Sequence, residues 1–325
     1  MPNSPVQPAV DAPAGAAIRT LTQAPASSSA QRVRGIALMI LAVGLFAVMD
    51  ALVKWLGRDY STVQLLFFRS VFAFIPLGFL VFRGGIGQAL RMRKPLAHLV
   101  RSLVGLVAIS TFFYGFAHMP LAEVIAISFA APIFVTALSV PLLGEKVGPL
   151  RWSAVLVGFI GVMIMLQPGT GLFNPISAVP LFGTVFYALA MIMVRKLSHT
   201  ETAASIVFYF TLTCALVSGA LLPFQWTTPG PVDLALLIAV GLVGGLAQIT
   251  ITKAFSLAEI AVVIPFEYSA MIWGALFGYF IWGEVPGNNI WVGVAIVTAS
   301  GLFILYREAA LGLPRGTARR LQAKR

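Results

Sequence analysis

Runs of about 20 mostly apolar residues, separated by short polar gaps, occur along most of the 325-residue chain. A helix rises about 1.5 Å per residue, so a run of this length crosses a hydrocarbon core of about 30 Å. Backbone polar groups find no water in lipid, and only helices and closed β-barrels satisfy them there. A barrel would show alternating apolar and polar residues in segments of about ten, whereas these runs are continuous. The pattern therefore predicts an all-α integral membrane protein.

We expect ten transmembrane helices, of which the fifth is short. The expected spans are residues 35–53, 62–82, 99–118, 123–143, 152–167, 176–194, 202–222, 234–252, 258–281 and 289–306. Composition agrees, because only 10% of the residues are charged, against about 25% in a typical soluble domain. The exterior that lacks these charges is expected to face the lipid bilayer.

Lysine and arginine gather in alternate gaps between the apolar runs, as they do in cytoplasmic loops. With the N-terminus in the cytoplasm, the cytoplasmic side receives every Lys and Arg except Lys54, Arg58 and Arg69, and Arg101 lies at the inner edge of the third span. We therefore expect a multi-pass protein of the cell inner membrane with both termini cytoplasmic. The same distribution argues against nucleic-acid binding, despite a net charge of +11.

Two short motifs occur twice in the chain. A Leu-Ala-Glu motif starts at residues 121 and 257, where the fourth and ninth spans begin, and a Gly-Glu pair starts at residues 144 and 283, where the same spans end. Equivalent helices are five apart, so the second copy must lie upside down relative to the first. Inverted repeats are typical of transporters whose binding site lies near the midplane between the halves. A duplicated channel would carry the same signature.

With Pro120 to Glu123 and the Gly-Glu pairs, the chain resembles the paired EamA domains of the drug/metabolite transporter superfamily over residues 35 to 306. Phe67-Phe68-Arg69, His98 to Arg101 and Val157 to Gly161 are similar to the S-adenosylmethionine and riboflavin carriers of that superfamily. The resemblance implies a ten-helix bundle that moves a small metabolite without ATP. Riboflavin uptake is the first expectation; S-adenosylmethionine uptake and export of an amino-acid-like metabolite are the alternatives.

The repeats divide the chain into four parts. We expect a disordered cytoplasmic tail over residues 1–34, a first EamA repeat over 35–168, a second over 175–306, and a basic cytoplasmic tail over 307–325.

Glu267 is the first candidate for substrate binding or coupling, because an ionisable residue inside a membrane is costly and usually functional. It lies near the middle of the ninth span and follows Pro265, which removes a backbone hydrogen bond and frees carbonyl groups. Pro132 interrupts the fourth span, the repeat equivalent of the ninth. Paired interruptions of this kind indicate a binding site. The alternatives are a structural partner for Glu267 and an ordinary proline kink.

Aromatic residues near these positions could stack on a planar ligand, or could simply pack. They are Tyr114, Phe129, Tyr268 and Trp273. Asp50 and Arg69 lie at matching depths in the first two spans, and we expect them to form an ion pair with a structural or gating role.

Other classes of function lack their signatures. A pump driven by ATP would need a phosphate-binding loop, and an intramembrane enzyme would need clustered nucleophile and base or metal ligands such as HExxH; neither is present. We therefore expect no catalytic residue, metal or cofactor. Gly241 with Gly245 and Gly274 with Gly278 are spaced for close helix packing, within the bundle or between the subunits of a homodimer.

Overall fold

The structure, a computed structural model, describes residues 29–84, 90–144, 148–167, 174–198, 200–257 and 263–310. Within these ranges the regular structure is entirely helical, with no strand. Most of both expected tails, residues 1–28 and 311–325, lies outside the described residues. So do Glu145 and the Ala258-Glu259 part of the repeated motif.

The elements follow one another with short connections. They are α2 (Ser29–Leu56), α3 (Thr62–Gly84), α5 (Pro95–His118), α6 (Leu121–Ser128), α7 (Ala131–Leu143), α8 (Pro149–Leu166), the 3₁₀ helix η1 (Pro175–Ser177), α9 (Ala178–Leu197), α10 (Ala203–Leu221), the 3₁₀ helix η2 (Leu222–Phe224), α11 (Pro231–Leu257), the 3₁₀ helix η3 (Ile264–Ser269), α13 (Ala270–Trp282) and α14 (Asn288–Ala310).

Seven segments of the described chain are long and apolar enough to cross a membrane, with α6 and α7 counted as one. Two shorter apolar helices, Trp152–Leu166 and Asn288–Ile304, accompany them. Large apolar side chains cover the outside of the bundle: Phe280 is 76% exposed, and Phe79 and Leu216 are each 64% exposed. Such a surface belongs in lipid. The all-helical membrane fold is confirmed, while the count of ten spans stays a prediction.

Proline and glycine set many of the helix boundaries. Pro95, Pro132 and Pro149 stand in the first two positions of α5, α7 and α8, where a missing N–H costs nothing. Gly144 and Gly283 follow α7 and α13 with φ of +65° and +69°, the left-handed conformation that ends a helix. The two Gly-Glu motifs thus have one structural cause, a glycine cap at equivalent helix ends.

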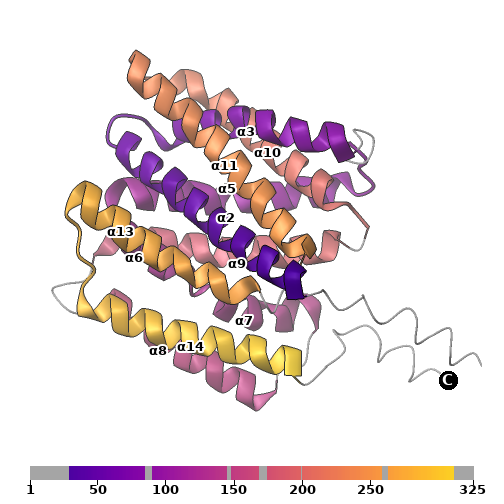
Figure 1. The fold of residues 1–325 in the computed structure, drawn as a ribbon, viewed down its shortest axis with the longest axis vertical. Coiled ribbons are helices and arrows are strands. Elements are labelled where there is room, and N and C mark those ends of the chain that lie inside the picture. The colour runs from indigo at the N-terminus through magenta and orange to yellow at the C-terminus, as the bar shows by residue number, and fades with distance from the viewer. Residues whose placement is uncertain are drawn as a thin grey trace, which may run out of the picture.

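The helices run side by side in one bundle (Figure 1). The start of α2 and the end of α14 lie at the same end of the bundle, which we call the terminal end; the opposite end, where α2 finishes at Leu56, is the far end. The most enclosed element is α6, in which six residues from Leu121 to Ile127 are buried. The core therefore centres on the first half of the interrupted fourth span.

The contacts between helices follow a two-fold pattern. Helix α2 packs along α11, and the equivalent pair is α9 with α5. Helix α3 contacts α11, as its equivalent α10 contacts α5. Three further pairs join a helix to its own equivalent: α3 with α10, α6 with α13, and α8 with α14. Each half therefore inserts its third helix into the other half.

Glycines allow the closest of these crossings. A Cβ on Gly241 would clash with Cβ of Phe72 and would lie 2.7 Å from the carbonyl oxygen of Phe68, so α11 closely approaches the backbone of α3. On α13, a Cβ on Gly274 would lie 2.5 Å from Cδ1 of Ile125 in α6. The expected packing role of these glycines within the bundle is thus visible in the structure.

A methyl group added at the α11–α3 crossing should loosen the bundle. In Gly245→Ala the new Cβ would lie 2.5 Å from Cγ of Pro76 and 3.0 Å from Cα of Ala73, so the backbone must shift. We expect a loss of about 1–3 kcal/mol of stability, measured by thermal unfolding in detergent. Gly78→Ala on α3 is the matched control, because its Cβ meets nothing within 4 Å. An equal loss in both variants would contradict the packing account.

Candidate functional site

Both predicted interruptions are present. The fourth span breaks after Ser128 and resumes at Ala131 as α7, with Pro132 near its start. In the ninth, Pro265 stands near the start of η3, ahead of α13. Short 3₁₀ segments inside apolar spans leave some backbone groups without regular helical bonds, which can line a site.

Three of the predicted site residues meet where these interruptions face each other. The rings of Phe129 and Tyr268 lie edge to face, with centroids 5.0 Å apart. The position of Gly301 on α14 faces both the Tyr268 hydroxyl and the Pro132 ring. Among the described residues, the buried Tyr268 hydroxyl has no hydrogen-bond partner. The fourth and ninth spans therefore present an aromatic pair and an unused hydroxyl to the same region.

Glu267 lies next to Tyr268 in η3 and is only partly buried. Its electrostatic neighbours are the tyrosines Tyr187 on α9 and Tyr268. Within the described part of the chain it forms no ion pair. A carboxyl group inside a membrane protein without a cationic partner fits the predicted role in binding or coupling.

Two further predicted aromatic residues, Trp273 and Tyr114, make contacts elsewhere. Trp273 packs against α2, where a Cβ on Gly44 would lie 3.4 Å from its ring. Tyr114 stacks on His118 of its own helix at 4.1 Å between ring centroids. A part for either in substrate binding stays a prediction.

Asp50 and Arg69 are close enough to attract each other, but the described structure holds no direct ion pair between them. Arg69 is only 6% exposed. Its stem passes Gly244 of α11, whose missing side chain leaves room for it. The ion pair expected from sequence thus stays a prediction, and Arg69 remains a buried cation.

A second arginine with buried guanidinium nitrogens was not expected from sequence. Helix α5 begins at Pro95 rather than near residue 99, so Arg101 falls in the second turn of the helix and not near its start. Its guanidinium carbon lies 4.3 Å from the centroid of Phe210 on α10. Arg69 approaches the same ring at 5.8 Å. The signal that could have found Arg101 is Pro95, which favours an earlier helix start.

The far end carries an ion pair that links three elements. Lys54 Nζ lies 2.8 Å from Glu284 Oε1 and donates to the carbonyl oxygen of Met119 at 2.5 Å. Glu284 Oε2 accepts the backbone N–H of Leu121 at 3.1 Å. Lys54, predicted to lie outside the first span, is in fact within α2 and 6% exposed. Together these contacts fasten α2 to the end of α13 and the start of α6.

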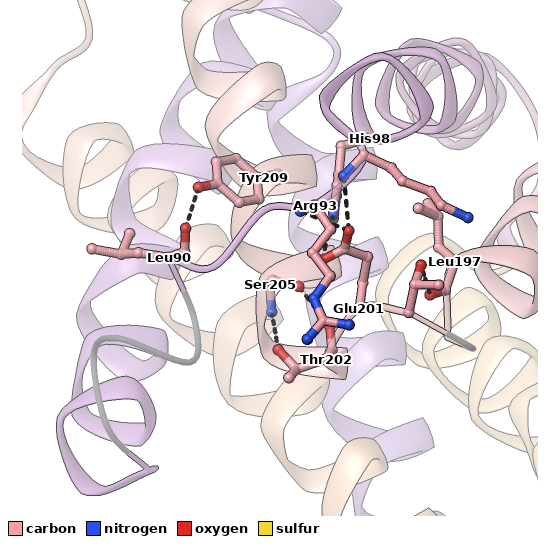
Figure 2. Close-up of polar contacts among 10 residues, drawn as sticks. Leu90, Arg93, His98, Leu197, Glu201, Thr202, Ser205 and Tyr209 are labelled. Atoms are coloured by element: carbon pink, nitrogen blue, oxygen red, sulfur yellow. Dashed lines mark hydrogen bonds and ion pairs between the residues drawn. The ribbon is translucent and has the colours of Figure 1, made fainter.

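The terminal end carries a different polar cluster (Figure 2). Glu201, in the α9–α10 connection, accepts the backbone N–H groups of Arg93 and Lys94, both at 2.9 Å. Its other carboxylate oxygen lies 3.6 Å from Nε2 of His98. Glu201 thereby caps the start of α5 from the opposite repeat, because the first N–H groups of a helix lack partners within it. The sequence offered no local motif for this contact.

Hydrogen bonds shift the acidity of Glu201. Burial raises the pKa of its carboxyl group, but the two N–H donors and the nearby His98 ring outweigh burial and hold the pKa below its ordinary value. The ionised form is therefore the one that the folded structure stabilises.

Three comparisons place the chain among known proteins. The model of the EamA-like transporter family matches residues 33–167 and 176–306. A solved crystal structure that is 16% identical in sequence aligns with 89% of this chain and 100% of its own, with a TM-score of 0.59, so the two share a fold.

Three relatives of this chain are described as transporters or exporters. The S-adenosylmethionine uptake transporter of Rickettsia prowazekii is 31% identical, covering 84% of this chain and 93% of that protein. The riboflavin transporter of Vibrio cholerae is 33% identical with the same coverage. The pseudopaline exporter CntI of Pseudomonas aeruginosa is 31% identical, covering 82% of this chain and 94% of its own. Their names and the apolar helices indicate a multi-pass membrane transporter rather than an enzyme.

The Glu201 cap should make stability depend on pH. Glu201→Ala removes two charge-assisted hydrogen bonds, so we expect a loss of about 1–3 kcal/mol near neutral pH. A carboxyl group with a lowered folded pKa stabilises the protein above its unfolded pKa, and this stability is lost as pH falls through the folded value. The gap in Tm between wild type and variant should therefore close below about pH 4. The exposed Asp59→Ala is the control, and a gap that persists in acid would contradict the assignment.

Proposed function

The chain belongs to the EamA-like transporter family, and on that premise we propose that it is a secondary or facilitative carrier of a small metabolite. Carriage across the cytoplasmic membrane would proceed by alternating access. The observation that supports this most is the two-fold exchange, in which each half packs its third helix into the other. Two halves joined in this way can rock about a shared region while one end opens and the other closes.

We infer that the two halves are inverted and supply five spans each, with both chain ends cytoplasmic. The start of α2 and the end of α14 lie at the same end of the bundle (Figure 1). This placement fits an even number of membrane crossings. The pairing of α3 with α10, α6 with α13 and α8 with α14 fits a two-fold axis between equivalent helices. In this arrangement, the repeats would span residues 35–168 and 175–306, and the terminal end would face the cytoplasm.

The substrate would occupy the region where the two interruptions meet. Phe129 and Tyr268 offer ring surfaces there, and Glu267 offers a carboxyl group one residue away. Riboflavin and S-adenosylmethionine, the compounds in the names of two relatives, both contain planar heteroaromatic rings. Uptake of riboflavin, the first expectation from sequence, and of S-adenosylmethionine are thus the two activities to test.

Neutralising Glu267 should stop transport without unfolding the protein. Liposomes containing purified Glu267→Gln should take up labelled substrate at least about tenfold more slowly than wild type, with an unchanged Tm. Asp59→Asn, at an exposed carboxylate of the α2–α3 turn, should transport normally. Full uptake by Glu267→Gln would remove this residue from the site. Growth of a riboflavin-requiring bacterium at low vitamin, with and without the gene, decides between the two substrates.

A further inference from the structure

Two arginines from different helices share one aromatic ring in the interior. The guanidinium carbons of Arg69 on α3 and Arg101 on α5 lie 5.8 Å and 4.3 Å from the centroid of Phe210 on α10. Gly105 lets this ring approach α5, since a Cβ there would lie 2.9 Å from Cε2 of Phe210. The three helices α3, α5 and α10 pack on one another. The cluster is thus fixed by backbone packing.

Both guanidinium groups have unused donors. In the described part of the chain, the buried Nε and Nη1 atoms of Arg69 and Arg101 make no hydrogen bond. An arginine side chain stays charged, and a buried charge needs a hydrogen-bonding partner. One ring shared by two cations supplies only part of that compensation. Four buried donors without an acceptor among the described residues indicate that another group completes the cluster.

The protein places little negative charge beside this cluster. Asp50 is the carboxylate that acts on Arg69, without direct contact. The electrostatic neighbours of Arg101 are Cys214, Tyr187 and Arg69 itself, and none is a carboxylate. The missing partner of these two cations is therefore an anion.

Tyr187 on α9 lies near both this cationic cluster and Glu267. Both Arg101 and Glu267 are electrostatic neighbours of Tyr187. Its side chain is 41% exposed midway along α9, and its ring contacts Phe112 of α5 edge to face, with centroids 6.4 Å apart. The accessible surface at Tyr187 is thus near both a cationic group and a carboxyl group.

We propose that Arg69 and Arg101 bind the carboxylate of an amino-acid-type substrate, whose cationic group is directed toward Glu267. The guanidinium fork matches a carboxylate with two parallel hydrogen bonds, and Phe210 and Tyr187 provide apolar surface beside it. This inference rests on the proposed function and names its substrate class. It ranks S-adenosylmethionine, which carries a carboxylate and positive charge, above riboflavin, which has no carboxylate.

Ligand pairs that differ only in the carboxylate test the site. Binding of S-adenosylmethionine and of its decarboxylated analogue to the purified protein is measured by calorimetry, and tryptophan with tryptamine forms a second pair. Wild type should bind at least one carboxylate about 30-fold or more tightly than its amine partner. Equal affinities within both pairs, or no binding of either carboxylate, would overturn the proposal.

Variants then assign the preference to the arginines. Arg101→Gln should lose the preference for the carboxylate, so that acid and amine bind alike, whereas the exposed Arg58→Gln should keep it. If Arg101→Gln is unstable, Arg101→Lys retains the charge without the fork and should show a reduced preference. A wild-type preference in either Arg101 variant contradicts the proposal. Because binding is read without transport, a wild type that binds but carries nothing would instead reject the proposed function.

Discussion

The absence of water from a bilayer core requires each polar group there to find its partner within the protein. Helices satisfy the backbone, and hydroxyl groups on them bond back to their own turns, as Thr136 does to Pro132 and Thr184 to Pro180. Lys54 is satisfied by Glu284 and a carbonyl group. Against this background, a small set of buried polar atoms among the described residues lacks a hydrogen bond, and it includes nitrogens of Arg69 and Arg101 and the hydroxyl of Tyr268. Departures from such a strict rule are where function is expected.

The two-fold pattern extends from the packing to the polar contacts at the ends. At the far end, Lys54 near the end of α2 joins Glu284 after α13. At the terminal end, Lys196 of α9 donates to the carbonyl oxygen of Leu142 in α7 at 2.9 Å. Helices α9 and α7 are the equivalents of α2 and α13, so the same pair of elements meets at opposite ends. Among the described residues, this contact is an ion pair at the far end and a hydrogen bond to a backbone carbonyl at the terminal end.

The apolar runs and paired motifs were enough to predict a helical membrane carrier with interruptions at Pro132 and Pro265. Length and hydropathy determine those features locally. Glu201 and Arg101 could not be assigned in this way. Glu201 acts on a helix start more than a hundred residues away, and Arg101 depends on where α5 begins. The orientation of Trp273 toward α2 also depends on which helix packs beside it, which no local pattern specifies.

Rocking of the two halves is tested most directly by distances at both ends of the bundle. Spin labels at Arg58 and Val285 report on the far end, and labels at Leu142 and Ser198 report on the terminal end; Cys214 is fully buried and can remain. The distances are measured in lipid bilayers, with and without the substrate that the protein transports in the liposome uptake assay. The account predicts that the two distances change in opposite directions when ligand binds. Changes in the same direction, or two unchanged distances, would contradict alternating access.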